Sequence, residues 1–139
     1  MRVLLDTNVV LDALLRREPF RVEAEAIVEA IKEGRIEGYV TATTLTDIFY
    51  IARKQMGAIV AKQYVSDILA TMQVCTVDRR ILQAAVASEL SDLEDAVQLT
   101  CAVANNVDAI VTRNFAGFVD SPVAIKFAGE ARGRRPRSG

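Results

Sequence analysis

Short apolar runs alternate with longer segments of helical periodicity along this chain, and this alternation is the strongest constraint on its fold. The first run, VLL at 3–5, contains no polar residue, which is typical of a strand buried on both faces of a parallel sheet. Strands that alternate with helices predict an α/β fold with a largely parallel sheet and right-handed crossovers. The predicted strands are 2–6, 37–42, 73–77, 108–114 and 123–127, and the predicted helices are 7–17, 19–33, 43–56, 58–72, 78–88 and 91–106.

Polar residues and a glycine mark several of the helix boundaries. Thr43 or Thr44 is predicted to cap the helix after the second strand, and Gly57 separates that helix from the next one. Ser91, followed three residues later by Glu94, has the pattern of a capping box. The apolar stripe after this box indicates that the last long helix packs on the sheet.

The 139 residues are predicted to form one domain over 1–127 and a basic, mobile C-terminal tail over 128–139. The tail has four arginines against one glutamate, a local charge of +3 within a formal total of −1. The domain is therefore acidic. Its average field would repel nucleic acid, which would have to be attracted by local basic patches or by metal ions.

The sequence predicts a cytoplasmic protein with no membrane partner. The first apolar run breaks at Asp6, too early for a secretory signal, and no run approaches the roughly 18 apolar residues of a membrane span. Cys75 and Cys101 lie in apolar segments and form no CxxC motif. Their placement predicts buried free thiols in a reducing compartment.

The chain contains no histidine, which excludes several kinds of chemistry. Ser-His-Asp and Cys-His catalysis, histidine-ligated zinc or iron, and acid-base catalysis by imidazole are all ruled out. Any reaction must therefore use carboxylates, hydroxyls, amides, lysine or arginine.

Two aspartates occupy unusual positions. Asp6 comes directly after the first apolar strand, where it either caps the next helix or points into a site at the sheet edge. Asp47 lies in the apolar segment TLTDIFYIA, where a partly buried carboxylate would need a partner or a metal ion. The alternative for Asp47 is an outward-facing residue near the start of its helix, where it favours the helix dipole.

Further polar residues are expected near the same edge of the sheet. Asp92 and Asp95 lie in the first turn of a helix, where acidic residues are common, and the segment TRN at 112–114 follows a strand. Carboxylates that gather at one edge repel each other by roughly 4 kcal/mol per close pair at an effective dielectric near 20. A divalent cation removes that cost, and oxygen ligands suit Mg²⁺ or Mn²⁺. Such ions activate water and stabilise the leaving oxygen of a phosphodiester without histidine.

Three ordered motifs make the chain similar to the PIN (PilT N-terminal) domain, especially to VapC-like ribonuclease toxins. They are LLDTNVVLDAL at the start, TATTLTDIFYI in the middle and DLEDAVQLTCAVANNVDAIVTRNFAGF near the end. The resemblance covers about residues 1–127. It implies a three-layer α/β/α sandwich around a central, mainly parallel sheet.

The resemblance also implies an Mg²⁺- or Mn²⁺-dependent endoribonuclease of a toxin–antitoxin pair. Its implied partners are an RNA substrate, a cognate antitoxin that covers the acidic pocket, and a second copy of the chain in a homodimer. The catalytic residues it implies are Asp6, Asp47, Asp95 and Asn114, the metal ligands are Asp6, Asp95, Asp47 and Asp92, and the supporting residues are Thr7, Asn8 and Thr112. Candidate RNA contacts are Arg113, Arg16 and Arg17.

Two positions depart from the family pattern. Asp47 stands where the family usually has glutamate, one methylene longer, and Gly117 stands where it often has an acidic residue. Asp6 and Asp95 match the pattern fully. The departures leave open a degenerate PIN domain that binds RNA or a protein without cutting.

Two other enzyme or signalling classes share part of the pattern. VLLDTN also resembles the first motif of haloacid dehalogenase-like phosphatases, but their second acid is replaced here by Asn8. A phosphoaspartyl intermediate would identify that class. Response-regulator receivers have an adjacent acidic pair after the first strand, and this chain lacks it.

Overall fold

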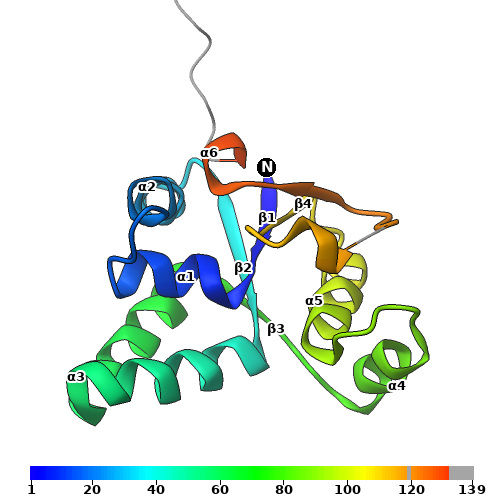
Figure 1. The fold of residues 1–139 in the computed structure, drawn as a ribbon, viewed down its shortest axis with the longest axis horizontal. Helices are drawn as coiled ribbons and strands as arrows, with labels where there is room; N and C mark the ends of the chain where they lie inside the picture. Colours follow the sequence, from blue (N-terminus) through cyan, green and yellow to red (C-terminus); the bar gives the residue numbers. More distant parts are fainter. Residues whose placement is uncertain (119, 132–139) are drawn as a thin grey trace, which may run out of the picture.

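A computed structural model describes residues 1–118 and 120–131, which form a five-stranded parallel sheet between two layers of helices (Figure 1). The order of the strands is β3-β2-β1-β4-β5, so β1 lies at the centre. The strands are β1 (Arg2–Leu5), β2 (Glu37–Thr41), β3 (Gln73–Cys75), β4 (Ala109–Val111) and β5 (Ala124–Lys126). The helices are α1 (Thr7–Leu14), α2 (Arg21–Lys32), α3 (Ala42–Thr71), α4 (Arg79–Ala87), α5 (Leu93–Ala104) and α6 (Ala128–Ala131), with a 3₁₀ turn, η1 (Phe115–Phe118).

Each face of the sheet is covered by its own hydrophobic core. Alternate residues of β1 divide between the two cores: Val3 and Leu5 pack with α1, α2 and α3, whereas Leu4 packs with α4 and α5. Figure 1 shows these two groups of helices on opposite sides of the strands. The three-layer α/β/α architecture predicted from the sequence is therefore confirmed, and it places the carboxyl ends of all five strands at one edge.

Capping differs in detail from the sequence prediction. Thr41 rather than Thr43 or Thr44 caps α3, because its side chain accepts a hydrogen bond from the Thr44 amide. Helix α3 is interrupted at Gly57, whose φ of 81° and ψ of 164° are not helical and are accessible mainly to glycine, so the predicted separation of two helices at Gly57 is confirmed.

The end of the domain differs from the predicted boundary. Residues 128–131, expected in the tail, form α6, in which Ala131 is buried in the same core as α2. The rest of the predicted tail, 132–139, lies outside the described residues. Cys75 and Cys101 are buried free thiols, as expected. Of the described helices, none has the length and apolar character that crossing a membrane requires.

Candidate active site

Asp6 begins the site, at the carboxyl end of the central strand. Its side chain is only 6% exposed and makes no helix-capping hydrogen bond, so the capping alternative does not apply. Instead, Oδ2 accepts from the Thr112 hydroxyl at 2.7 Å, and Oδ1 accepts from Nε2 of Gln98 at 3.1 Å. The expected supporting residues Thr7 and Asn8 do not make these bonds. Thr112, directly after β4, and Gln98 on α5 thus fix the carboxylate of Asp6 at the end of β1.

Thr112 also orders the loop that follows β4. Its hydroxyl donates to Asp6 and accepts from the backbone amide of Asn114 at 3.0 Å. The Thr112 amide itself donates to the carbonyl of Lys126 in β5 at 2.9 Å. This single buried residue therefore links the sheet edge, the first acid and the turn that presents Asn114.

Helix α5 brings a second group of acids to the same edge. Asp92 caps the helix, because its Oδ1 accepts from the Asp95 amide at 2.9 Å. The structure thereby replaces the predicted Ser91 cap with Asp92, whose role as a metal ligand stays a prediction. Burial and the charges of Asp92, Asp6 and Glu94 raise the pKa of Asp95 to about 6. Negative charges from β1 and α5 therefore act on one another at this edge.

Glu94 is a further acid of the site, which the sequence analysis treated only as part of a cap. Burial raises the pKa of its carboxyl; a hydrogen bond from Thr7 lowers it, and the charges of Asp47, Asp6 and Asp92 raise it. Asp47 is partly exposed, and its charge reaches Glu94. Asp47 is therefore partly buried, as expected, and it contributes negative charge to the site.

Four threonine hydroxyl groups form a chain of hydrogen bonds that ends at the carboxylate of Glu94. Thr7 Oγ1 donates to Glu94 Oε1 at 3.0 Å and lies 2.9 Å from Thr44 Oγ1. Because each hydroxyl has one hydrogen, Thr44 must donate to Thr7, and Thr41 in turn donates to Thr44 at 3.1 Å. Thr43 then completes the chain at Thr41. All of these hydroxyl dipoles point their positive ends toward the carboxylate, which they stabilise in its ionised form.

Gly117 packs directly against the side chains of Asp95 and Asn114. A Cβ at this position would overlap Oδ2 of Asp95 and lie 2.7 Å from Nδ2 of Asn114. The structure thus brings Asn114 and Asp95 together around a glycine. An acidic side chain, which the family often has here, could not be added without moving Asp95.

The three arginines proposed to contact RNA have different environments. The guanidinium of Arg113 makes two hydrogen bonds to the buried Asp12 and lies 4.2 Å from the centre of the Phe20 ring. Arg17 lies 3.9 Å from the same carboxylate. Arg16 is exposed and has a positive φ of 55°. All three arginines stay predictions as RNA contacts, and of the three Arg113 is the one paired by two hydrogen bonds with a buried carboxylate.

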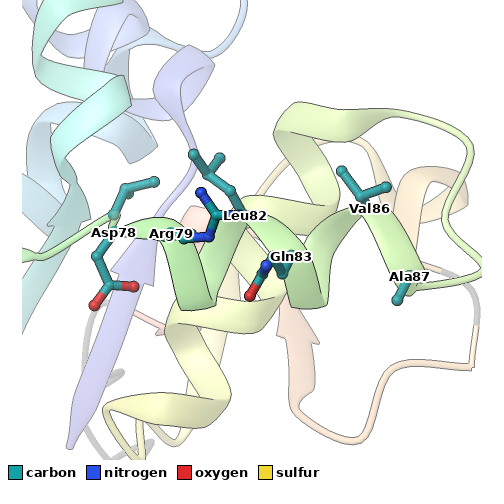
Figure 2. A pocket seen from close by; sticks show the side chains of 7 residues that line it. Asp78, Arg79, Leu82, Gln83, Val86 and Ala87 are labelled. Carbon is teal, nitrogen blue, oxygen red and sulfur yellow. The ribbon is translucent and has the colours of Figure 1, made fainter.

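A separate hollow on α4 contains none of these residues. Figure 2 shows its lining, which includes Leu82, Val86 and Asp78. Asp78 serves as the cap of α4, because its Oδ1 accepts from the Ile81 amide at 3.0 Å. This hollow therefore combines an apolar surface with Asp78, Arg79 and Gln83, and it contains none of the acids near Asp6.

The raised pKa of Asp95 predicts a pH-dependent stability difference that needs no bound metal. Burial and neighbouring negative charges raise the pKa of Asp95 to about 6 in the folded protein, above its ordinary value, so the ionised carboxyl destabilises the fold. The cost is absent below pH 4, grows between pH 4 and 6, and is complete above pH 6. In chelator at pH 7.5, Asp95→Asn should be more stable than the parent by roughly 1 kcal/mol after allowance for solvent screening, about 3 °C in Tm.

Thermal melts of the parent and Asp95→Asn from pH 3.5 to 8 check this expectation. The difference in Tm should vanish at the acid end of the series. A constant difference across the whole range would show that the charge of Asp95 is not its cause.

Two site residues were missed by the sequence analysis, although each left a signal. Gln98 is fully buried and lies three residues after Asp95 on α5, so both project from neighbouring positions of one helix face. The amide side chain of Gln98 lies among apolar residues on the buried side of α5, and such a polar residue indicates a site. Glu94 was hidden because its spacing from Ser91 matched a capping box.

Comparisons with known proteins identify the class of domain. The family model described as "PIN domain" matches residues 2–116, and the chain belongs to this family. A search of curated proteins found no match to the chain.

Solved structures share the fold at low sequence identity. One of them is VapBC2 from Rickettsia felis, solved bound to a DNA fragment from the VapBC2 promoter. Its TM-score is 0.65 at 15% identity, and the match covers 91% of this chain and 98% of that chain. VapBC-1 from nontypeable Haemophilus influenzae has a TM-score of 0.68 at 15% identity, covering 92% and 98%. DNA-bound VapBC from Salmonella typhimurium has a TM-score of 0.68 at 17% identity, with the same coverage. At these identities the likeness establishes the common fold.

Proposed function

We propose that this PIN-domain protein is an endoribonuclease that hydrolyses RNA phosphodiester bonds with Mg²⁺ or Mn²⁺ held at the acidic edge of the sheet. The observation that supports the proposal best is the environment of Asp6. Its buried carboxylate is held by two donors that are distant in the sequence and makes no capping hydrogen bond, and its charge adds to burial and to Asp92 in raising the pKa of Asp95. A carboxylate held in this way, opposite a second one, is suited to a cation rather than to stabilising the fold.

The donor set fits a hard divalent cation in its chemistry. In residues 1–118 and 120–131, no three acidic, cysteine or histidine side chains come close enough to share one ion. Mg²⁺ does not require three, since it keeps several waters and is commonly bound by one or two carboxylates together with substrate phosphates. Asp6 and Asp95 would hold the ion, with Asn114 beside Asp95 and with Glu94 and Asp47 adding negative charge.

Each residue of the acidic edge would have its own role in the proposed hydrolysis. A divalent cation bound here lowers the pKa of a coordinated water and stabilises charge on the phosphate. Thr112 and Gln98 fix the direction of the Asp6 carboxylate, and Gly117 lets Asp95 approach the turn that carries Asn114. Glu94, which accepts a hydrogen bond from Thr7 and whose pKa is raised mainly by burial, would be a further carboxylate beside the ion.

We further propose that the protein is the toxin of a toxin–antitoxin pair. The support is the PIN-domain assignment together with the fold shared with VapBC structures. The proposed partners are RNA, a cognate antitoxin protein and a second copy of the chain. Arg16 and Arg17, on the loop after α1, are the proposed phosphate contacts.

Cleavage assays with purified protein test the proposed function. One unstructured and one hairpin RNA, labelled at the 5′ end, would be incubated with Mn²⁺, with Mg²⁺ and with EDTA. Internal cleavage that requires the metal and disappears in EDTA is expected. Equal cleavage in EDTA would contradict the metal-dependent chemistry.

A non-catalytic PIN domain is the second candidate. It is favoured by the shorter Asp47 and by the lack of any three-acid cluster in the described ranges. RNA binding without cleavage in Mg²⁺ or Mn²⁺, unchanged in Asp6→Asn, would identify this function.

A further inference from the structure

We infer that Asp12 and Arg113 form a clamp that positions the loop carrying Thr112 and Asn114 against the acidic site. In this role Arg113 is a positioning residue rather than a contact to RNA. The inference deepens the proposed nuclease function and rests on it for its catalytic readout. Its structural readout stands independently.

The clamp is built on a carboxylate that the fold has buried almost completely. Asp12 lies on α1 and is 1% exposed. Its Oδ2 accepts from Nε of Arg113 at 3.0 Å and its Oδ1 accepts from Nη2 at 3.3 Å, so the two planar groups meet side by side. Such paired bonds fix orientation as well as distance. The guanidinium of Arg17, at 3.9 Å from Oδ1, adds charge but makes no hydrogen bond to the Asp12 carboxylate, while the Arg17 amide donates to the Asp12 carbonyl at 3.0 Å.

The guanidinium of Arg113 is held on a second side as well. It lies over the ring of Phe20, 4.2 Å from the ring centre, on the segment between α1 and α2. Hydrogen bonds at the edge of the guanidinium and an aromatic ring on its face leave little freedom to turn toward a phosphate. This arrangement suits an anchor for the loop better than a mobile RNA contact.

The clamp gives the loop a second attachment to α1. The first is the hydroxyl of Thr112 on Asp6, and the second is Arg113 on Asp12, six positions further along the helix. At 1.5 Å per residue the two points are about 9 Å apart, far enough to prevent the loop from pivoting about either one. Asn114, which follows at once, is thereby held in position next to Asp95. Without Arg113 the loop would lose its side-chain hydrogen bonds to α1 and would keep those of Thr112 to Asp6 and to the Lys126 carbonyl.

Variants of both partners test the clamp. Asp12→Asn, Arg113→Gln, Arg113→Lys and the double variant Asp12→Asn/Arg113→Gln would be compared with Arg21→Gln, which removes an arginine from the ion pairs with Glu18 and Glu25 on the surface. The readouts are the Kd for Mn²⁺ by calorimetry, kcat and KM for RNA, and hydrogen exchange of the Asn114 amide in chelator. The double variant leaves no buried unpaired charge, so it keeps the test valid if a single variant fails to fold.

Each clamp variant is expected to weaken Mn²⁺ binding by about 10- to 100-fold and to speed Asn114 exchange about tenfold, with KM for RNA unchanged. The double variant should be no worse than Arg113→Gln, because both act on one contact. Arg113→Lys should resemble Arg113→Gln, since lysine lacks the paired donors.

Two results would overturn the clamp. The first is a raised KM in Arg113→Gln but not in Asp12→Asn, with Mn²⁺ affinity intact, which would make Arg113 an RNA contact. The second is unchanged Asn114 exchange in every variant. If the parent protein neither binds Mn²⁺ nor cuts RNA, the proposed function fails, but exchange at Asn114 still decides the clamp.

Discussion

Asp6→Asn is expected to lower RNA cleavage by about 10³-fold or more while the protein stays folded. The exchange removes one negative charge from the site and keeps the shape of the side chain. A bound metal ion supplies several kcal/mol of transition-state stabilisation, and about 4 kcal/mol corresponds to a factor of 10³. The loss should appear in kcat, and Mn²⁺ binding should be lost with it.

The surroundings of Asp6 explain why the variant should fold. The asparagine oxygen can accept from Gln98 as Asp6 Oδ1 does, and its NH₂ group can donate to the Thr112 hydroxyl, which then acts as an acceptor. Circular dichroism and a thermal melt would establish folding, and calorimetry would measure Mn²⁺ binding. Asp67→Asn, which makes the same change at an exposed site on α3, is the matched control and should behave as the parent. Full activity in Asp6→Asn would exclude Asp6 from the chemistry.

Gly117→Ala is expected to reduce cleavage by about 100-fold without reducing stability. The new methyl group would overlap the Asp95 carboxylate, so this flexible side chain must swing away. A displacement of about 1 Å in a catalytic group can cost 10²-fold in rate. The backbone at Gly117 does not have a positive φ, so alanine can adopt it. Alanine also lowers the conformational entropy of the unfolded chain, which favours folding by roughly 0.4–1 kcal/mol. Rate and stability should therefore change in opposite directions.

Gly129→Ala gives a control with the same chemistry elsewhere in the fold. A Cβ on Gly129 would lie 2.7 Å from a carboxylate oxygen of Glu23, so here too a methyl group displaces a carboxylate. This variant should cleave RNA at the parent rate. Single-turnover cleavage and thermal melts of both variants decide the matter. Equal rates for Gly117→Ala and the parent would show that the position of Asp95 is not critical.

Much of the fold follows from patterns that are local in the sequence. The uninterrupted VLL run before Asp6 predicts a central strand because only a strand covered on both faces can bury every side chain. The fully buried Val3, Leu4 and Leu5 confirm this reasoning. The strand end at Asp6 also predicts an acid at the sheet edge, which the structure shows.

The partners of the acids could not be predicted in the same way. Gln98 and Thr112 reach Asp6 from positions 92 and 106 residues away, so the pairing depends on how α5 and β4 lie against β1. Family resemblance named Thr7, Asn8 and Thr112 as supporting residues; of these Thr112 donates to Asp6, whereas Gln98 was not named. In the structure Thr7 turns to Thr44 and Glu94, and Asn8 to Arg17.

The capping of α5 shows a second limit of sequence patterns. Ser91 and Asp92 are both good caps, and they differ by one position. The choice of Asp92 assigns its carboxylate to the helix end and leaves Glu94 free to accept from Thr7. One residue of register therefore decides which side chain caps α5 and whether Glu94 takes part in the cap.

The most direct test of the account is where a divalent ion binds. A crystal of the protein soaked in Mn²⁺ would be measured at the manganese absorption edge. An anomalous peak between the carboxylates of Asp6 and Asp95, absent in crystals of Asp6→Asn, is the predicted result. A peak elsewhere, or none at Mn²⁺ concentrations that support RNA cleavage, would contradict it.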